Sequence, residues 1–122
     1  TRDFTYVLDL VQGLVKSGFY EEAVGENFNL AAGKEISIVD MASKVQGVTK
    51  NDQDFIFKAR RKWDTKPRLL ASIEKAEKLI NYNPIIEFDE GFKENLNWFK
   101  LFDEEIKNSS DFPPGMSSAV KS

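Results

Sequence analysis

The stretch RDFTYVLDL, which spans residues 2–10, predicts how the chain begins to fold. Residues 2–7 are rich in β-branched and aromatic types and predict a short strand. Asp9 is expected to begin a helix that ends at Gly18. One face of this helix is apolar and consists of Leu10, Val11, Leu14 and Val15. Since few domains open directly on a strand, we expect the chain to be a piece of a longer protein.

Strand and helix patterns alternate from there onward. Residues 26–31 and residues 55–57 predict two more strands, and Gly33 predicts a turn after the first of them. Ser37 and Asp40 have the spacing of a capping box, with Asp in place of Glu, and predict a helix through about Val45. The buried stripe of that helix would be Ile38, Met41, Ala42 and Val45.

Two more helices are expected on either side of a turn at residues 81–84. Ser72 would cap the first, which buries Ile73, Ala76, Leu79 and Ile80. Asp89 would start the longest helix, with one face made of Phe92, Leu96, Phe99, Phe102 and Ile106. Short strands alternating with helices predict an α/β fold, in the form of an α+β-like small lobe over residues 1–107. Residues 108–122 are largely Ser, Pro, Gly and Lys and predict a disordered tail.

Composition excludes several kinds of function. The chain has 122 residues, enough for one domain, and neither Cys nor His, which excludes disulfides, thiolate or histidine metal sites and histidine-based triads. A net charge of −3 disfavours nucleic acid and anionic membranes as partners. No apolar run reaches the ~18 residues of a membrane span. We expect no metal, and a cytoplasmic location.

A basic cluster follows the third predicted strand. Arginine presents a planar fork of donors that suits phosphate, and aromatic rings beside the cluster offer a stacking surface for a base or sugar. The alternative interpretation is a solvated loop, and an acidic chain makes a nucleic-acid patch less favourable. The cluster is Lys58, Arg60, Arg61 and Lys62, flanked by Phe57 and Trp63.

Arg2 and Asp3 stand together at the start of the first predicted strand. An arginine at a strand end is able to reach into a cleft, but the simpler interpretation is a salt bridge between the two neighbours. Asp9 is interpreted as a helix cap rather than as a functional acid.

The motifs of dinucleotide and acyl chemistry are absent from these residues. The glycines do not form G-x-G-x-x-G, no G-x-S-x-G occurs, and the carboxylates form no evident acid/base pair. None of the three tyrosines is followed by lysine four positions later. We therefore assign no catalytic residue to the chain.

Three stretches, taken in order, resemble the extended short-chain dehydrogenase/reductase family, the sugar-nucleotide epimerases and dehydratases of the UDP-glucose 4-epimerase type. Residues 2–10 are similar to its R-D-[FY]-x-[YH]-V-x-D segment. Residues 28–38 are similar to its strand–turn–helix "N-L/V-[GA]-x-G … S-[VI]". Residues 60–99 look like its closing run, through R-x-x-D, S-x-x-K-A, Y-x-P, E-G-F and W.

The resemblance implies roles for four residues. Arg2 and Arg61 correspond to the basic residues that bind the substrate diphosphate, and Asp64 to an acid near the nucleotide ribose. Phe4 corresponds to an aromatic position beside the substrate. Trp63 and Asn81 depart from the pattern, since relatives often have glycine at both places, although Asn is also acceptable as a helix C-cap.

The resemblance also implies what the chain does. It would be the substrate-binding lobe of an NAD-dependent sugar-nucleotide epimerase, with the 4-epimerase type preferred, or of a 4,6-dehydratase. The partner would be a UDP-, dTDP- or CDP-sugar. NAD would bind to the family's N-terminal Rossmann half, so this chain alone is expected to bind no cofactor and to be inactive. An apolar face left for that half would favour self-association. The alternative is a non-enzymatic binding or interaction module derived from the lobe.

Overall fold

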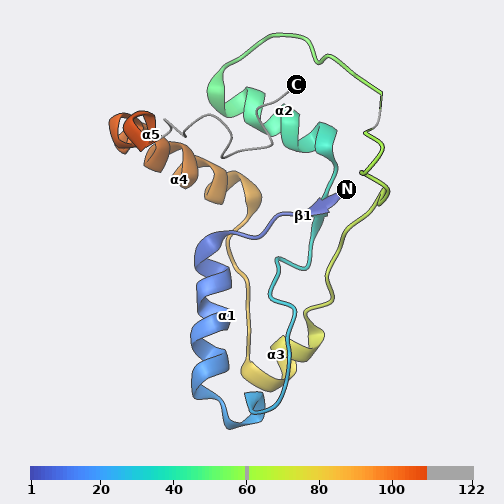
Figure 1. Ribbon diagram of the computed structural model, residues 1–122, viewed down its shortest axis with the longest axis vertical. Coiled ribbons are helices and arrows are strands. Elements are labelled where there is room, and N and C mark those ends of the chain that lie inside the picture. The colour runs from blue at the N-terminus through green and yellow to red at the C-terminus, as the bar shows by residue number, and fades with distance from the viewer. Residues whose placement is uncertain (60, 110–122) are drawn as a thin grey trace. The chain divides into compact units, whose positions relative to one another are not determined.

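The computed structural model describes residues 1–59 and 61–109 (Figure 1). It divides after Gly91 into two compact units. The helices are α1 (Val7–Phe19), η1 (Glu21–Ala23, a 3-10 turn), α2 (Ile38–Thr49), α3 (Glu74–Ile80), α4 (Phe88–Leu101) and α5 (Asp103–Ser109), and the strands are β1 (Arg2–Asp3) and β2 (Glu35–Ile36). The predicted α/β class is confirmed in the form of a helix-rich lobe with short strands.

The sheet is smaller than the sequence predicts. β1 and β2 pair antiparallel, with Arg2 opposite Ile36 and Asp3 opposite Glu35. The strand expected over residues 2–7 is therefore limited to its first two residues, and residues 26–31 and 55–57 form no strand. Within the described chain neither segment has a neighbouring strand to pair with, and strand propensity is effective only where such a neighbour exists.

α1 turns a polar face inward. It begins at Val7, so the prediction that Asp9 caps it is wrong: Asp9 lies in the first turn with a side chain only 3% exposed. Its two carboxylate oxygens accept the backbone N–H groups of Ile85 and Ile86 at 3.1 and 3.0 Å. One and two turns further on, Gln12 bonds both the N–H and the C=O of Asn83, and Lys16 Nζ donates to the carbonyl of Asn81. We call Asp9, Gln12 and Lys16 the polar seam of α1.

The apolar face of α1 lies opposite the polar seam and is exposed. The pattern of the face was predicted correctly, but its side chains are about half accessible to solvent. The exposed side chains are Val7, Leu8, Leu10, Val11, Leu14 and Val15.

Local signals at α2 and α3 are confirmed only in part. Ser37 Oγ accepts the N–H of Asp40 at 2.9 Å and so caps α2, which continues to Thr49 rather than ending near Val45. The predicted buried stripe of α2 is wrong, since none of its residues is buried in the described chain. Amphipathic spacing shows which face is apolar, but burial needs a partner surface. The cap expected at Ser72 is also wrong, because the N-cap of α3 is Ile73.

The core of the first unit gathers under α3. Ala76, Ile80 and Tyr82 are almost fully buried, with Leu30 packed among the flanking residues. The hydroxyl of Tyr82 donates to the carbonyl of Ala31 at 3.0 Å. α1 approaches so closely that a Cβ at Gly13 would lie 2.6 Å from a methyl of Leu30.

The second unit contains most of α4 and all of α5. The single long helix expected from Asp89 is broken at Phe102, where the ring of Trp98 lies 5.3 Å from that of Phe102. Residues 110–122, most of the predicted tail, lie outside the described residues, whereas Asn108 and Ser109 end α5. No helix in the described ranges is long and apolar enough to cross a membrane.

Candidate functional site

The candidate site lies where β1 meets the irregular segment of residues 61–68. Arg2 Nη2 donates to Asp64 Oδ1 at 2.7 Å, and the two side chains are only 26% and 29% exposed. Arg2 Nη1 also donates to the carbonyls of Thr1 and Lys66, at 2.7 and 3.2 Å. The salt bridge expected between Arg2 and Asp3 is thus replaced by one with a residue distant in sequence.

Arg2 keeps capacity for a further anion. A guanidinium carries five N–H donors, and the three bonds above use three of them within the described chain. A charged arginine held by carbonyls and one carboxylate is fixed in place before a ligand arrives. Because the Asp64 carboxylate offsets the charge of Arg2, a diphosphate at this place would need a second cation besides Arg2.

Arg61 and Asp64 belong to one tight turn. The N–H of Asp64 donates to the carbonyl of Arg61 at 3.1 Å. The guanidinium of Arg61 lies over the ring of Trp63, 5.6 Å from its centroid, and Trp63 itself is 76% exposed. The turn therefore presents a cation and a large aromatic face together, next to the residue that pairs with Arg2.

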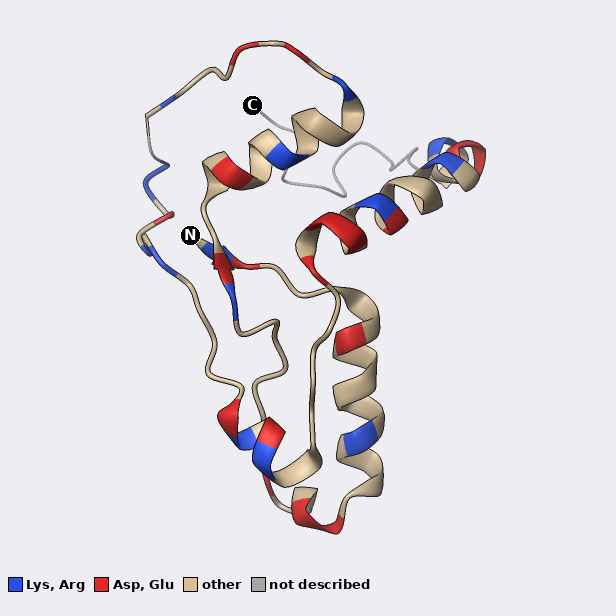
Figure 2. Ribbon diagram, turned by 180° about the vertical axis from the view of Figure 1, so that it is seen from behind, with Lys and Arg blue, Asp and Glu red and all other residues tan. Residues whose placement is uncertain are grey.

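Positive charge is repeated along this segment. Figure 2 shows Lys and Arg positions recurring along the irregular chain between α2 and α3. In the described residues they are Lys50, Lys58, Arg61, Lys62, Lys66 and Arg68. The acidic net charge of the whole chain thus conceals a locally basic strip.

Asp3 has a structural role that the sequence did not indicate. Its carboxylate accepts the backbone N–H groups of Ala32 and Gly33, both at 3.1 Å. Gly33 adopts a φ of +68°, which confirms the predicted turn, and Asp3 fixes that turn against β1.

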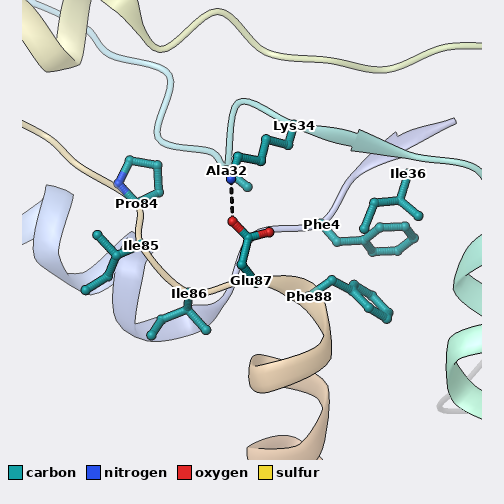
Figure 3. A pocket seen from close by; sticks show the side chains of 9 residues that line it. All are labelled: Phe4, Ala32, Lys34, Ile36, Pro84, Ile85, Ile86, Glu87 and Phe88. Carbon is teal, nitrogen blue, oxygen red and sulfur yellow. Dashed lines mark hydrogen bonds and ion pairs between the residues drawn. The ribbon is translucent and has the colours of Figure 1, made fainter.

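Phe4 lies in a separate small cavity (Figure 3). Its ring contacts that of Phe88 edge to face, with centroids 5.4 Å apart, and an ion pair between Lys34 and Glu87 spans the same cavity. The volume of about 30 Å³ holds about one or two waters and is too small for a sugar.

A wider groove of about 690 Å³ lies between the Gly33 turn, residues 70–73 and α3. Its size suits a small molecule. Glu74 and Glu77 line it, however, and two carboxylates disfavour a diphosphate there.

The structure brings together three of the four predicted site residues. Arg2 and Asp64 are paired, Arg61 shares the turn of Asp64, and Phe4 lines the separate cavity. Sequence reasoning missed Glu35 and Arg68, whose side chains form an ion pair at 2.7 Å beside the site. Arg68 is one of a run of cations and belongs to no motif, so nothing distinguished it.

The entry into α1 is not of the dinucleotide-binding type. Such a site needs a glycine-rich turn between a strand and a helix, whereas the chain enters α1 through Phe4, Thr5 and Tyr6. In the same described ranges no group of three acidic side chains is arranged to hold a metal ion.

Comparisons with known proteins match most of the chain. No family model matches the chain. It is 29% identical over 121 residues to UDP-glucuronic acid decarboxylase 1 of Xenopus tropicalis, covering 99% of this chain and 28% of that protein. It is 35% identical over 111 residues to UDP-glucuronate 4-epimerase of Thermodesulfobacterium geofontis, covering 88% of this chain and 32% of that protein. The chain thus spans about a third of the length of these relatives.

Solved structures give the same result. The epimerase Mth375 of Methanothermobacter thermautotrophicus is 40% identical with a TM-score of 0.83, over 88% of this chain and 32% of that one. The Bordetella bronchiseptica enzyme WbmF, solved with NAD+ and UDP, is 29% identical with a TM-score of 0.71, over 88% of this chain and 32% of that one.

Proposed function

The chain belongs to the extended short-chain dehydrogenase/reductase family, of which it matches the C-terminal region, and from this premise we propose that it binds the diphosphate of a nucleotide sugar through Arg2 and Arg61. Asp64 would meet the nucleotide ribose. The UDP-sugars are the preferred substrate class, because the matched relatives are named for UDP-glucuronate and UDP.

The ion pair between Arg2 and Asp64 is the observation that carries the proposal. It joins the R-D segment at the start of the chain to the R-x-x-D turn, two motifs that the family resemblance independently assigns to one substrate. Neither arginine alone would hold a phosphate firmly in water, since an exposed ion pair contributes little. The proposal therefore requires Arg2 and Arg61 to contact the same diphosphate, at roughly 1.5–3 kcal/mol for each charge-assisted hydrogen bond.

The lobe would contribute binding and orientation rather than bond making. The diphosphate lies away from the reacting sugar carbon, so contacts to it position the sugar and lower the barrier only through that placement. When bound to the family's N-terminal half, NAD supplies transient oxidation of the sugar. A 4-epimerase is the preferred reaction, and a 4,6-dehydratase the second choice.

The exposed apolar face of α1 supports a further part of the proposal. Leu8 and Leu14 are 61% and 59% exposed, although they belong to a continuous apolar stripe. We assign this face to contact with the N-terminal half of the family, which the longer relatives possess. Without that half, the face would favour self-association. The expected boundary at residue 107 and the cytoplasmic location remain predictions.

The test is a titration of the purified chain with UDP, in which calorimetry or NMR detects binding. Arg61→Ala should weaken UDP binding about tenfold or more, as loss of one charge-assisted bond implies. Arg60→Ala and Lys62→Ala remove the same charge one position away and should have smaller effects. Failure of the wild-type chain to bind UDP would reject the proposal, and a larger effect at Arg60 would shift the assignment by one residue.

A further inference from the structure

The segment that carries Arg61 and Asp64 has no helix or strand of its own. Residues 51–73 contain no regular element where they are described. A binding turn on such a chain needs anchors, because ordering a free segment costs about 1–2 kcal/mol of backbone entropy per residue. What anchors this segment therefore affects how well the turn is placed.

The first anchor is the backbone of Thr1. Its nitrogen donates to the carbonyl of Pro67 at 2.8 Å, and its carbonyl accepts the N–H of Leu69 at 3.2 Å. Residues 67–69 thus follow the first residue of the chain as a neighbouring strand would. Arg2, next to Thr1, is the residue that reaches Asp64.

The second anchor is a side-chain cluster between β2 and the segment. Arg68 Nε donates to both carboxylate oxygens of Glu35, at 2.9 and 2.7 Å. The hydroxyl of Thr1 donates to one of the same oxygens at 2.7 Å. Hydrogen bonds from Arg68 and then Thr1 lower the pKa of the Glu35 carboxyl below its ordinary value.

These contacts fix both ends of a short stretch. Asp64 is held to β1 through Arg2, and Arg68, four residues later, is held to β2 through Glu35. Glu35 lies opposite Asp3 in the sheet, so both anchors belong to the same two strands. A change at Glu35 would therefore alter the freedom of the turn without touching either proposed phosphate ligand.

We propose that Glu35 and Arg68 are positioning residues, whose ion pair holds residues 64–68 against the two strands and thereby sets where Arg61 and Asp64 stand relative to Arg2. The effect on ligand binding rests on the proposed function, whereas the anchoring of the segment does not. Loss of the ion pair removes no proposed ligand contact. The turn would instead be ordered only when the ligand binds, and the entropy lost in that step would weaken binding.

The experiment compares the wild-type chain with Glu35→Gln and Arg68→Gln in two measurements. Hydrogen exchange at the N–H of Leu69 reports anchoring, and titration with UDP reports binding. Each variant should exchange about two- to fivefold faster at Leu69 and bind UDP more weakly by a similar factor, the size that one exposed ion pair allows. The double variant should lose no more than either single one, because both remove the same interaction.

Glu26→Gln is the matched control, since it breaks the exposed ion pair with Lys75 of α3, outside residues 64–69 and outside both strands. It should change neither measurement. Unaltered exchange at Leu69 in Glu35→Gln would overturn the anchoring, and faster exchange with wild-type UDP affinity would overturn the positioning role. A wild-type chain that binds no UDP would instead reject the proposed function and the positioning role together, while the exchange data still decide the anchoring.

Discussion

Arg2 Nη2 and Asp64 Oδ1 lie 2.7 Å apart, although 62 positions separate the two residues in the sequence. The bond closes a long irregular connection onto the first strand. It also means that the arginine proposed to bind a diphosphate already has an internal carboxylate partner. The ligand would therefore bind to an arginine that is already paired with Asp64.

Arg2→Lys tests whether the shape of this cation matters as well as its charge. Lysine has a single donor head that does not reproduce three bonds in three directions, so the substitution should weaken UDP binding about tenfold. Lys58→Arg, a swap in the opposite direction on an exposed position, serves as the control. UDP affinity equal to wild type in Arg2→Lys would show that the fork is unimportant.

Asp9→Ala should strongly destabilise the first unit. It removes a buried carboxylate and leaves the N–H groups of Ile85 and Ile86 without their acceptor. Charge-assisted bonds of this kind contribute about 1.5–3 kcal/mol each, so a loss of roughly 3 kcal/mol in unfolding free energy is expected. Urea unfolding measures it, and Asp54→Ala, at an exposed position, should stay within about 0.5 kcal/mol of wild type.

Tyr82 predicts a limit of stability at high pH. Burial, with smaller contributions from Asp9 and Asp3, raises the pKa of its phenol above the ordinary value. The unfolded chain then loses this proton at a lower pH than the folded chain. The contribution of the Tyr82 phenol to the free energy of unfolding is fully present below a pH of about 10. It is lost as the pH rises through the pKa of that phenol in the folded chain.

Tyr82→Phe checks that assignment. The variant should be less stable at pH 7 by about 1–3 kcal/mol, because the carbonyl of Ala31 loses its buried partner. It should also lose less stability than wild type between pH 9 and 11. Parallel alkaline curves for the two proteins would show that another group is responsible.

The apolar face of α1 should make the isolated chain prone to self-association. We expect binding of a hydrophobic dye and association at micromolar concentration, both reduced by Leu8→Lys with Leu14→Lys. Glu21→Gln with Glu22→Gln, in the exposed turn after α1, raises the net charge by the same amount without touching the face. A monomeric, dye-silent and highly stable wild-type chain would contradict this prediction.

Turnover is not expected from the 122 residues alone. The chain should convert no nucleotide sugar in the presence of NAD, because it has neither a dinucleotide loop nor Tyr-x-x-x-Lys. Product analysis with UDP-glucuronate and UDP-glucose, next to a full-length epimerase as positive control, gives the measurement. Conversion by material free of host enzyme would refute this prediction.

The alternative, a non-enzymatic module, is distinguished by the rest of its gene. Such a gene would encode neither G-x-x-G-x-x-G nor Tyr-x-x-x-Lys, whereas the gene of an enzyme would encode both.

Local features were predictable because their causes are local. Gly33 and Asn81 adopt the positive φ expected of a turn and a helix C-cap, and Ser37 caps α2. The predictions of strands at residues 26–31 and 55–57 are wrong because a strand forms only where a second segment pairs with it. Asp9 was misread for a similar reason: its partners are backbone groups 76 and 77 positions away, which no periodicity reveals.

The site was predictable only in part. The family resemblance indicated Arg2, Arg61 and Asp64, which the structure places around one turn. Glu35 and Arg68 carry no motif, and their relationship follows from the pairing of β1 with β2 and of Thr1 with residues 67–69.

The polar seam of α1 bears on how such a lobe changes during evolution. Asp9 and Gln12 recognise main-chain N–H and C=O groups of the segment 83–86, and every residue except proline supplies both. These hydrogen bonds therefore place no requirement on the side chains of Ile85 and Ile86, which line the cavity of Phe4. Substitutions at these two positions would change the wall of the cavity while the hydrogen bonds from α1 to the backbone are retained.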